Sequence, residues 1–327
     1  MMNKYSVILF FLVVFLTSCF KEKPIAKPNY TGTPITANMG VDYTQQLYFD
    51  VQTRQFVDSN SRFDFDLAFD CASGKYFVWL NGANLMQCVR TGKTDLSTVT
   101  LSDTASKRWY VEFGSGLEDS NAIGKWFLPG TTTSNNEVYI LKLGIDMDGK
   151  VLGYRKIKLN DYNGTYSITF CNMDNSDLHT ATVDKVANKN KVFLSFKNGG
   201  VIKDFEPSQS DWDLIFTSYS TYFYVEKLPY RVTGVLTNPH KARAYFVDSI
   251  TDYSTITLAS VSPDRWNIKQ DNIGYEWKAY EYGTYSVNPK KTYIIQSDNR
   301  YFKMRFLDFY SASGTKGYPK FEIKELL

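Results

Sequence analysis

The stretch DWDLIF, residues 211–216, has the composition of a buried β-strand, and nearly the same six residues, DFDLAF, occur at 64–69. The second stretch lies 147 positions after the first. The segment YRKIKLNDY from Tyr154 matches YFKMRFLDF from Tyr301 at the same spacing, and Lys156 and Lys303 hold equivalent polar positions. Two matches at one offset predict an internal duplication, with homologous units at residues 38–180 and 183–327.

The composition of the chain favours β-sheet. Among its 327 residues are 24 Tyr and 23 Phe, side chains that pack well on a pleated surface. Asn-Gly, Asp-Gly and Ser-Gly pairs interrupt short apolar runs, and Asp148-Gly149 is a strong signal for a hairpin turn. We therefore expect an all-β protein with two tandem two-sheet units, which fold either separately or as one pseudo-symmetric body. The alternative is one large β-sandwich whose strands have similar sequences without a duplication.

Charge and motifs exclude several classes of function. A formal net charge of +3 with no basic cluster does not indicate a nucleic-acid partner. The sequence has no GxSxG, HExxH or P-loop motif, and its two His leave little room for His-based catalysis in duplicate. No CxxC motif supports a zinc site. We expect a binding protein, not an enzyme.

The N-terminus has the pattern of a secreted lipoprotein. Lys4 precedes an apolar run, Val7 to Leu16, that is shorter than the roughly 20 residues of a membrane-spanning helix. The following Leu-Thr-Ser-Cys resembles a bacterial lipobox, which predicts a signal peptide at residues 1–18 and a lipid on Cys19. Three Pro and mixed charge in residues 19–37 predict an extended tether between lipid and domain.

Three cysteines remain after Cys19. Cys71 and Cys88 fall on apparently neighbouring strands separated by Asn81-Gly82, so in an oxidising compartment they are candidates for a disulfide. The alternative is that they are buried free thiols, because Cys is a common small core residue.

Three segments of the second unit resemble the HmuY family of bacterial lipoproteins. They are the opening strand DWDLIF, the late strand YFKMRFLDFY from Tyr301, and GTKGYPKFEI at 314–323. The first unit matches the first two segments, but its ending, NGTYSITF, lacks the Gly-Tyr-Pro element. The resemblance implies a two-sheet β fold, a lipid anchor at the outer membrane of a Gram-negative bacterium, and capture of haem for iron acquisition. It also implies a TonB-dependent outer-membrane receptor as a partner.

Haem in this family is held by a pair of His or Met ligands between the opening and closing strands. In the second unit, residues 217–292 contain His240 and no Met, whereas residues 70–137 of the first contain Met86 and no His. His240, after the turn-forming pair Asn238-Pro239, is the best candidate for an axial ligand, and a solvent-facing loop residue is its alternative. A second ligand would have to bridge the units or be a Tyr; the candidates outside these windows are His179, Met147 and Met173, and the Tyr candidates are Tyr222, Tyr224, Tyr280, Tyr282 and Tyr285. We expect no other metal.

The aromatic run YSTYFYVEKLPY, residues 219–230, is a candidate platform for a porphyrin or a sugar ring, and sheet packing is its alternative. Because neither unit has a pair of His or Met ligands, a second function stays open. The protein would then be an interaction module for a glycan, a peptide or an outer-membrane partner.

Overall fold

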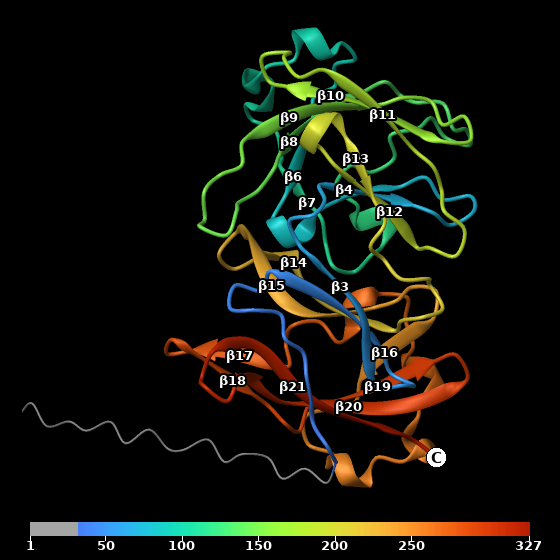
Figure 1. Cartoon of the computed structure of the whole chain (residues 1–327), viewed down its shortest axis with the longest axis vertical. Coiled ribbons are helices and arrows are strands. Elements are labelled where there is room, and N and C mark those ends of the chain that lie inside the picture. Colours follow the sequence, from blue (N-terminus) through green and yellow to red (C-terminus); the bar gives the residue numbers. More distant parts are fainter. Residues whose placement is uncertain (1–31) are drawn as a thin grey trace, which may run out of the picture.

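The computed structural model describes residues 32–327, which form two β bodies stacked along the long axis of the molecule (Figure 1). Each body contains two antiparallel sheets that enclose a hydrophobic core. The predicted all-β, two-sheet architecture is therefore confirmed. Within the described residues, no helix is both long and apolar enough to cross a membrane.

The first body, uppermost in Figure 1, is built from ten strands. They are β4 (Leu67–Asp70), β5 (Val78–Leu80), β6 (Gln87–Arg90), β7 (Tyr110–Val111), β8 (Val138–Lys142), β9 (Tyr154–Leu159), β10 (Tyr166–Asn172), β11 (His179–Val183), β12 (Lys191–Ser195) and β13 (Val201–Lys203). One sheet has the order β11-β10-β9-β8-β6-β7, and the other has the order β13-β12-β4-β5.

The second body repeats this plan. Its strands are β1 (Ile35–Thr36), β2 (Gln45–Asp50), β3 (Gln55–Ser61), β14 (Leu214–Phe223), β15 (Leu228–Thr237), β16 (Ala242–Phe246), β17 (Lys278–Glu281), β18 (Thr284–Val287), β19 (Thr292–Ser297), β20 (Arg300–Tyr310) and β21 (Lys316–Glu325). One sheet has the order β1-β21-β20-β19-β16, the other has the order β15-β14-β2-β3, and β17 and β18 form a separate ribbon.

Alternation along the two quoted strands explains both cores. In β4, Leu67 and Phe69 point into the core of the first body, whereas Ala68 packs on the opposite face with Trp79. In β14, Leu214 and Phe216 point into the core of the second body. Successive side chains of a strand face opposite sides of its sheet, so each strand presents a second face outward from its own body.

Short 3-10 turns connect many of the strands. They are η2 (Gly82–Asn84), η3 (Leu96–Thr98), η4 (Leu101–Thr104), η5 (Glu118–Ser120), η6 (Lys197–Gly199), η7 (Tyr253–Thr255), η8 (Leu258–Ser260), η9 (Pro263–Arg265) and η10 (Gln270–Asn272). Buried lysines from β9 and β20 hold two of these turns. Lys156 Nζ donates to Leu96 O at 2.7 Å, and Lys303 Nζ donates to Tyr253 O at 2.6 Å.

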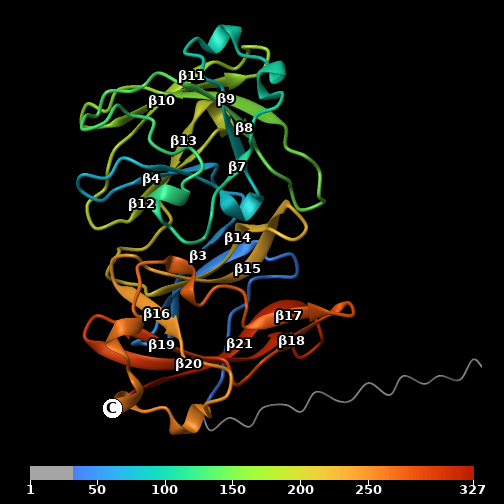
Figure 2. The ribbon, with the colours of Figure 1, turned by 180° about the vertical axis from the view of Figure 1, so that it is seen from behind.

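The expected boundary near residues 180–183 falls within strand β11 and is not a boundary between the two bodies in space. Strand β2 of the first repeat pairs with β14 of the second, whereas β12 of the second repeat pairs with β4 of the first. The strands at the starts of the two units, β1 and β11, pair with β21 and β10. In Figures 1 and 2 the blue strand β3 accordingly lies in the lower body, and the yellow strand β13 lies in the upper body.

This arrangement is a reciprocal exchange, in which each repeat contributes its first strands to the sheets of the other. An apolar strand such as β2 fits any sheet edge with a matching face, so its sequence does not specify which copy of the opening strand it joins. The exchange ties the two bodies together through the chain itself.

The expected tether ends earlier than predicted. Ile35 pairs with Phe321 in the outer sheet of the second body, and Ala37 and Met39 are fully buried. Residues 35–37 therefore belong to the folded body. The predicted signal peptide and Cys19 lie outside the described residues.

Candidate functional site

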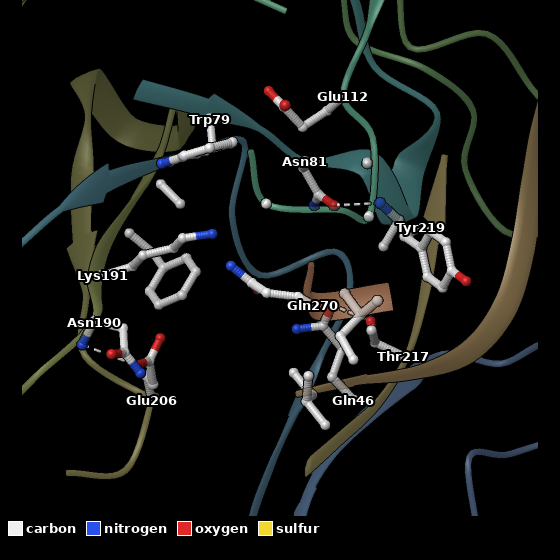
Figure 3. Close-up of a pocket in the computed structure, with 18 of the residues that line it drawn as sticks. Gln46, Trp79, Asn81, Glu112, Asn190, Lys191, Glu206, Thr217, Tyr219 and Gln270 are labelled. Carbon is white, nitrogen blue, oxygen red and sulfur yellow. Dashed lines mark hydrogen bonds between the residues drawn. The ribbon is translucent and has the colours of Figure 1, made fainter. Parts of the chain in front are cut away.

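A cavity of about 140 Å³ lies where the four-stranded sheets of the two bodies face each other (Figure 3). The first body contributes Phe65, Ala68, Trp79 and Phe193 to its walls, and the second contributes residues of the opposite sheet, among them Tyr48, Trp212, Ile215 and Leu236. These are the outward faces of the strands described above. The repeated strands DFDLAF and DWDLIF thus each line a body core on one side and this cavity on the other.

An amine and an amide point into the cavity. Figure 3 shows Lys191 and Gln270 extending toward each other from opposite walls. Lys191 Nζ lies 4.7 Å from the centre of the Trp79 ring, a cation–π contact. Among the described residues, neither side chain has a hydrogen bond or an ion pair with a protein group.

Two buried carboxyl groups also line the cavity. Glu112 Oε2 accepts from Leu80 N at 3.1 Å, and burial raises the pKa of this carboxyl to about 8. Glu206 Oε1 accepts from Asn190 N at 3.1 Å, and burial raises its pKa to about 7. The positive charge of Lys191 lowers both values, but burial outweighs it. Both groups are therefore largely protonated below neutral pH.

The cavity opens outward into a cleft of about 700 Å³ between the bodies. Trp79, Lys191, Pro239 and Gln270 line both spaces, so the cleft and the cavity are continuous. Apolar and charged side chains alternate along the cleft, where Ile268 and Leu117 lie among lysines and acids. A volume of this size is in the ordinary range for a ligand pocket.

His240 stands on the rim of this cleft. It follows β15, where Asn238 Oδ1 accepts its backbone N–H at 2.9 Å, and its side chain is exposed. The predicted loop position is confirmed. Its role as a haem ligand stays a prediction.

The structure brings no second His or Met to His240 among the described residues that line the cleft and the cavity. His179 lies in β11, with Nε2 2.7 Å from Asp177 Oδ1 and its ring beside Phe170. Met86 is fully buried in the core of the first body. Met147 and Met173 lie outside both spaces.

The aromatic run at 219–230 divides between two surroundings. Tyr219 is buried and lines the cavity, whereas the rest of the run forms the tip of the β14–β15 hairpin, where Phe223 stacks on Tyr230 at 4.7 Å. The predicted Tyr candidates, Tyr222, Tyr224, Tyr280, Tyr282 and Tyr285, lie on this hairpin and on the β17–β18 ribbon, and none lines the cleft or the cavity. They therefore offer no ligand to an iron near His240.

Cys71, Cys88 and Cys171, the cysteines of the described residues, are free thiols. Cys71 follows β4 in the four-stranded sheet, whereas Cys88 lies in β6 of the facing six-stranded sheet. Cys88 Sγ donates to Ala122 O at 3.1 Å. The proposed Cys71–Cys88 disulfide is therefore absent, because the strands taken as neighbours belong to different sheets.

A third repeated segment lies at a different spacing from the other two. TDLSTVTLSDTASKRW at 94–109 matches TDYSTITLASVSPDRW at 251–266, at an offset of 157 instead of 147. The β14–β15 hairpin is longer than its counterpart and shifts the register, which hides this match from a search at one fixed spacing. The aligned Trp109 and Trp266 lie beside the aligned Tyr154 and Tyr301, with ring centres 6.1 and 6.2 Å apart.

Residues 187–323 match the family model described as HmuY protein. The matched range begins just before β12 and ends within β21, so it spans the second repeat along the chain, including its exchanged strands. No match is found among the curated proteins.

Several solved structures resemble the chain at low identity. Apo PinO from Porphyromonas gingivitis is 9% identical with a TM-score of 0.36, and the alignment covers 91% of this chain and 99% of that one. The apo HmuY analog (TFO) of Tannerella forsythia is 10% identical with a TM-score of 0.26, covering 92% and 99%. A putative HmuY_like heme binding protein from Bacteroides vulgatus is 13% identical with a TM-score of 0.22, covering 32% and 84%.

Proposed function

Because residues 187–323 match the HmuY family model, we propose that the protein binds haem or a related porphyrin in the cleft between its two bodies. The observation that carries the proposal is the exposed imidazole of His240 on a cleft of about 700 Å³. Imidazole is a common ligand of haem iron. The name of the Bacteroides vulgatus structure, a putative heme binding protein, agrees with this ligand.

The macrocycle would lie in the outer cleft, because the inner cavity of about 140 Å³ is smaller than pockets for ligands of drug size. The side chains of Pro239 and Ile268 offer apolar contacts beside His240. Lys189 lines the same cleft and Lys269 lines the groove on the other side of His240, so both lie within the region that the propionates would reach. The protein would supply one axial ligand to the iron.

The site would serve iron acquisition at the cell surface. The lipid on Cys19 would hold the domain on the outer membrane, since each buried CH₂ of an acyl chain contributes roughly 0.8 kcal/mol. The bound haem would then pass to a TonB-dependent receptor. Ligand exchange with such a partner is easier when the iron has only one protein ligand.

A haemin titration tests the proposal. Haemin is added to the unlipidated chain, residues 20–327, and the Soret band is followed. We expect a saturable shift that is lost in His240→Ala and kept in His179→Ala, because His179 lies away from the cleft. Unspecific broadening that is the same in all three proteins contradicts the proposal.

The second candidate function is an interaction module without haem. Its specific observation is the group of exposed rings on the two hairpins, where Tyr224 is 77% and Tyr280 is 64% exposed and Tyr282 is fully exposed. Such rings offer flat faces to a sugar or to a partner protein. A glycan array with the wild type and a Tyr224→Ala/Tyr282→Ala variant tests it, and equal signals from both proteins argue against it.

A further inference from the structure

We propose that the inner cavity between the bodies is a second binding site, for a small monocarboxylate with an apolar body of about the size of benzoate. The proposal does not rest on haem binding at His240, although the cavity opens into the cleft that His240 lines. The anchor of this site is the ammonium group of Lys191, and Gln270 is its second polar contact.

The walls and the size of the cavity determine the size and the apolar character of the ligand. Phe65, Trp79, Phe193 and Trp212 surround the space with aromatic faces, and Ala68 leaves room at its floor. The volume of about 140 Å³ is close to the cavity of about 150 Å³ that accommodates benzene in another protein. A single six-membered ring therefore fits, whereas a porphyrin does not.

The polar groups that line the cavity determine the charge of the ligand. Lys191 carries a positive charge into a space with largely aromatic walls. Its ammonium contacts the Trp79 ring and interacts electrostatically with Glu112, Glu206 and Asp70, but among the described residues no carboxylate lies within ion-pair distance of it. The aromatic walls beside Lys191 screen charge less than bulk water does, so an anion that reaches this partly buried ammonium gains more than it would at a fully exposed lysine. The geometry places one ammonium group there, which compensates one negative charge.

The Gln270 side chain lies against the backbone of Gly116. A Cβ atom on Gly116, whose φ is +65°, would lie 2.0 Å from Gln270 Nε2. Glycine at 116 thus makes the space that the amide occupies. The amide can donate a hydrogen bond to the second oxygen of a carboxylate held by Lys191.

The neighbouring acids favour a monoanion over phosphate. Glu206, beside Asn190 on the wall of Lys191, and Glu112 also line the cavity, and Asp70 lines the adjoining cleft; burial raises the pKa of all three carboxyls. Lys189, on the same wall, already pairs with Asp204 at 3.0 Å. A dianion would meet one free cation and several acids. As the pH rises through about 7 to 8, Glu206 and Glu112 ionise and compete for Lys191, so the affinity for the ligand should fall.

Benzoate, benzamide and inorganic phosphate are the probes, and the fluorescence of Trp79 and Trp212 together with isothermal titration calorimetry gives the readout. At pH 6 we expect saturable benzoate binding that weakens at least tenfold in Lys191→Met and at pH 9. Benzamide, which has the same shape without charge, should bind at least tenfold more weakly, and phosphate should not bind.

A second variant separates loss of charge from loss of fold. Ala68→Leu keeps Lys191 but fills the cavity, and it should abolish benzoate binding while the thermal unfolding midpoint stays near the wild-type value. His240→Ala should keep benzoate binding, so failure of the haem proposal is visible separately. No saturable response of the wild type to benzoate, or equal binding of benzamide, or equal binding by Lys191→Met, overturns the proposal.

Discussion

The two bodies share a set of hydrogen bonds made by a repeated Asp and a repeated Asn. They differ in the turn that follows the Asn. In the first body the N–H of Asp66 donates to Leu194 O at 2.8 Å, and its carboxylate accepts from Phe196 N at 2.7 Å. In the second body Asp213 makes the same two bonds to the exchanged strand β2, with Phe49 O and Val51 N, both at 2.9 Å. The repeated Asp therefore fastens the exchanged strand to the opening strand in each copy.

An asparagine that is repeated in both copies makes the next shared hydrogen bonds. Asn81 Nδ2 donates to Arg62 O and Phe65 O, and Asn238 Nδ2 donates to the equivalent carbonyls, Gln209 O and Trp212 O. Beyond this residue the copies diverge. The turn after Asn81 is buried, with Ala83 3% exposed, whereas the turn after Asn238 emerges at the cleft with an exposed His240. Two copies of one fold can thus keep the same hydrogen bonds while only one copy exposes a side chain that could bind a ligand.

The largest expected loss of stability tests whether the hydrogen bonds of the repeated Asn are equivalent in the two bodies. Asn81→Ala and Asn238→Ala each remove the side-chain partner of two carbonyls and one N–H, so each should lower the free energy of unfolding by about 3 kcal/mol. Denaturant unfolding measures it. Asn299→Ala, at an exposed turn, is the control and should change stability by less than about 0.5 kcal/mol. A cost confined to one of the two buried positions breaks the comparison.

The buried lysines offer the next comparison. Lys156→Met and Lys303→Met remove the ammonium groups that bond the carbonyls of η3 and η7, and each should lower the free energy of unfolding by about 2 kcal/mol. Thermal unfolding of both variants checks this, with exposed Lys150→Met as the matched control. If both variants match the control, the lysines do not hold the turns in solution.

A pH series tests a difference between the copies. Glu112 is buried in the first body, and its aligned position in the second body is the exposed Lys269. The folded-state pKa of Glu112 is raised from 4.5 to about 8, so between these values the native state binds more protons than the unfolded state. Stability should therefore fall as the pH rises through that window.

Glu112→Gln removes this titration while keeping an oxygen acceptor for Leu80 N. At pH 9 the variant should be more stable than the wild type by roughly 1–3 kcal/mol, and near pH 5 the two should be similar. Urea unfolding at both pH values measures the gap. A gap of equal size at both pH values would show that burial does not govern the titration of Glu112.

The smallest effect concerns turns that belong to only one copy. Gly149, in the loop between β8 and β9, has a φ of +78°, and Gly283, in the β17–β18 turn, has a φ of +82°; an added Cβ meets nothing within 4 Å at either position. Ala at either position should cost about 1 kcal/mol, through backbone conformation alone. Thermal unfolding measures it, and a loss several times larger would reveal a contact that these open turns lack.

Much of this fold could be predicted from local sequence. The alternation of DFDLAF and DWDLIF gives strands with two buried faces, and Asp148-Gly149 predicts the turn that the Ile145–Val151 bridge closes. Asn238-Pro239 correctly places His240 in an exposed loop. These features depend on residues close together in the chain, so they can be predicted from the local sequence pattern.

The cavity could not be predicted in this way. Lys191 lies at the start of an exchanged strand, and Gln270 belongs to the other body, so no short segment contains both. Their meeting depends on which opening strand β12 joins, and a strand of this composition suits either. The same ambiguity kept a Cys71–Cys88 disulfide open as an alternative to free thiols, because sheet membership is decided by distant partners.

The exchange of first strands also imposes an order of assembly during synthesis. Strand β12 meets β4 after the earlier strand has already been made, so the first body can close as soon as residue 203 is available. The hairpin of β2 and β3 has to wait, because Val51 bonds Asp213, 162 positions later. At about 5–20 residues per second this interval is roughly 8 to 30 seconds. During that time the apolar face of β2 has no native cover, which makes the N-terminal hairpin the segment of the nascent chain that most depends on protection by a chaperone.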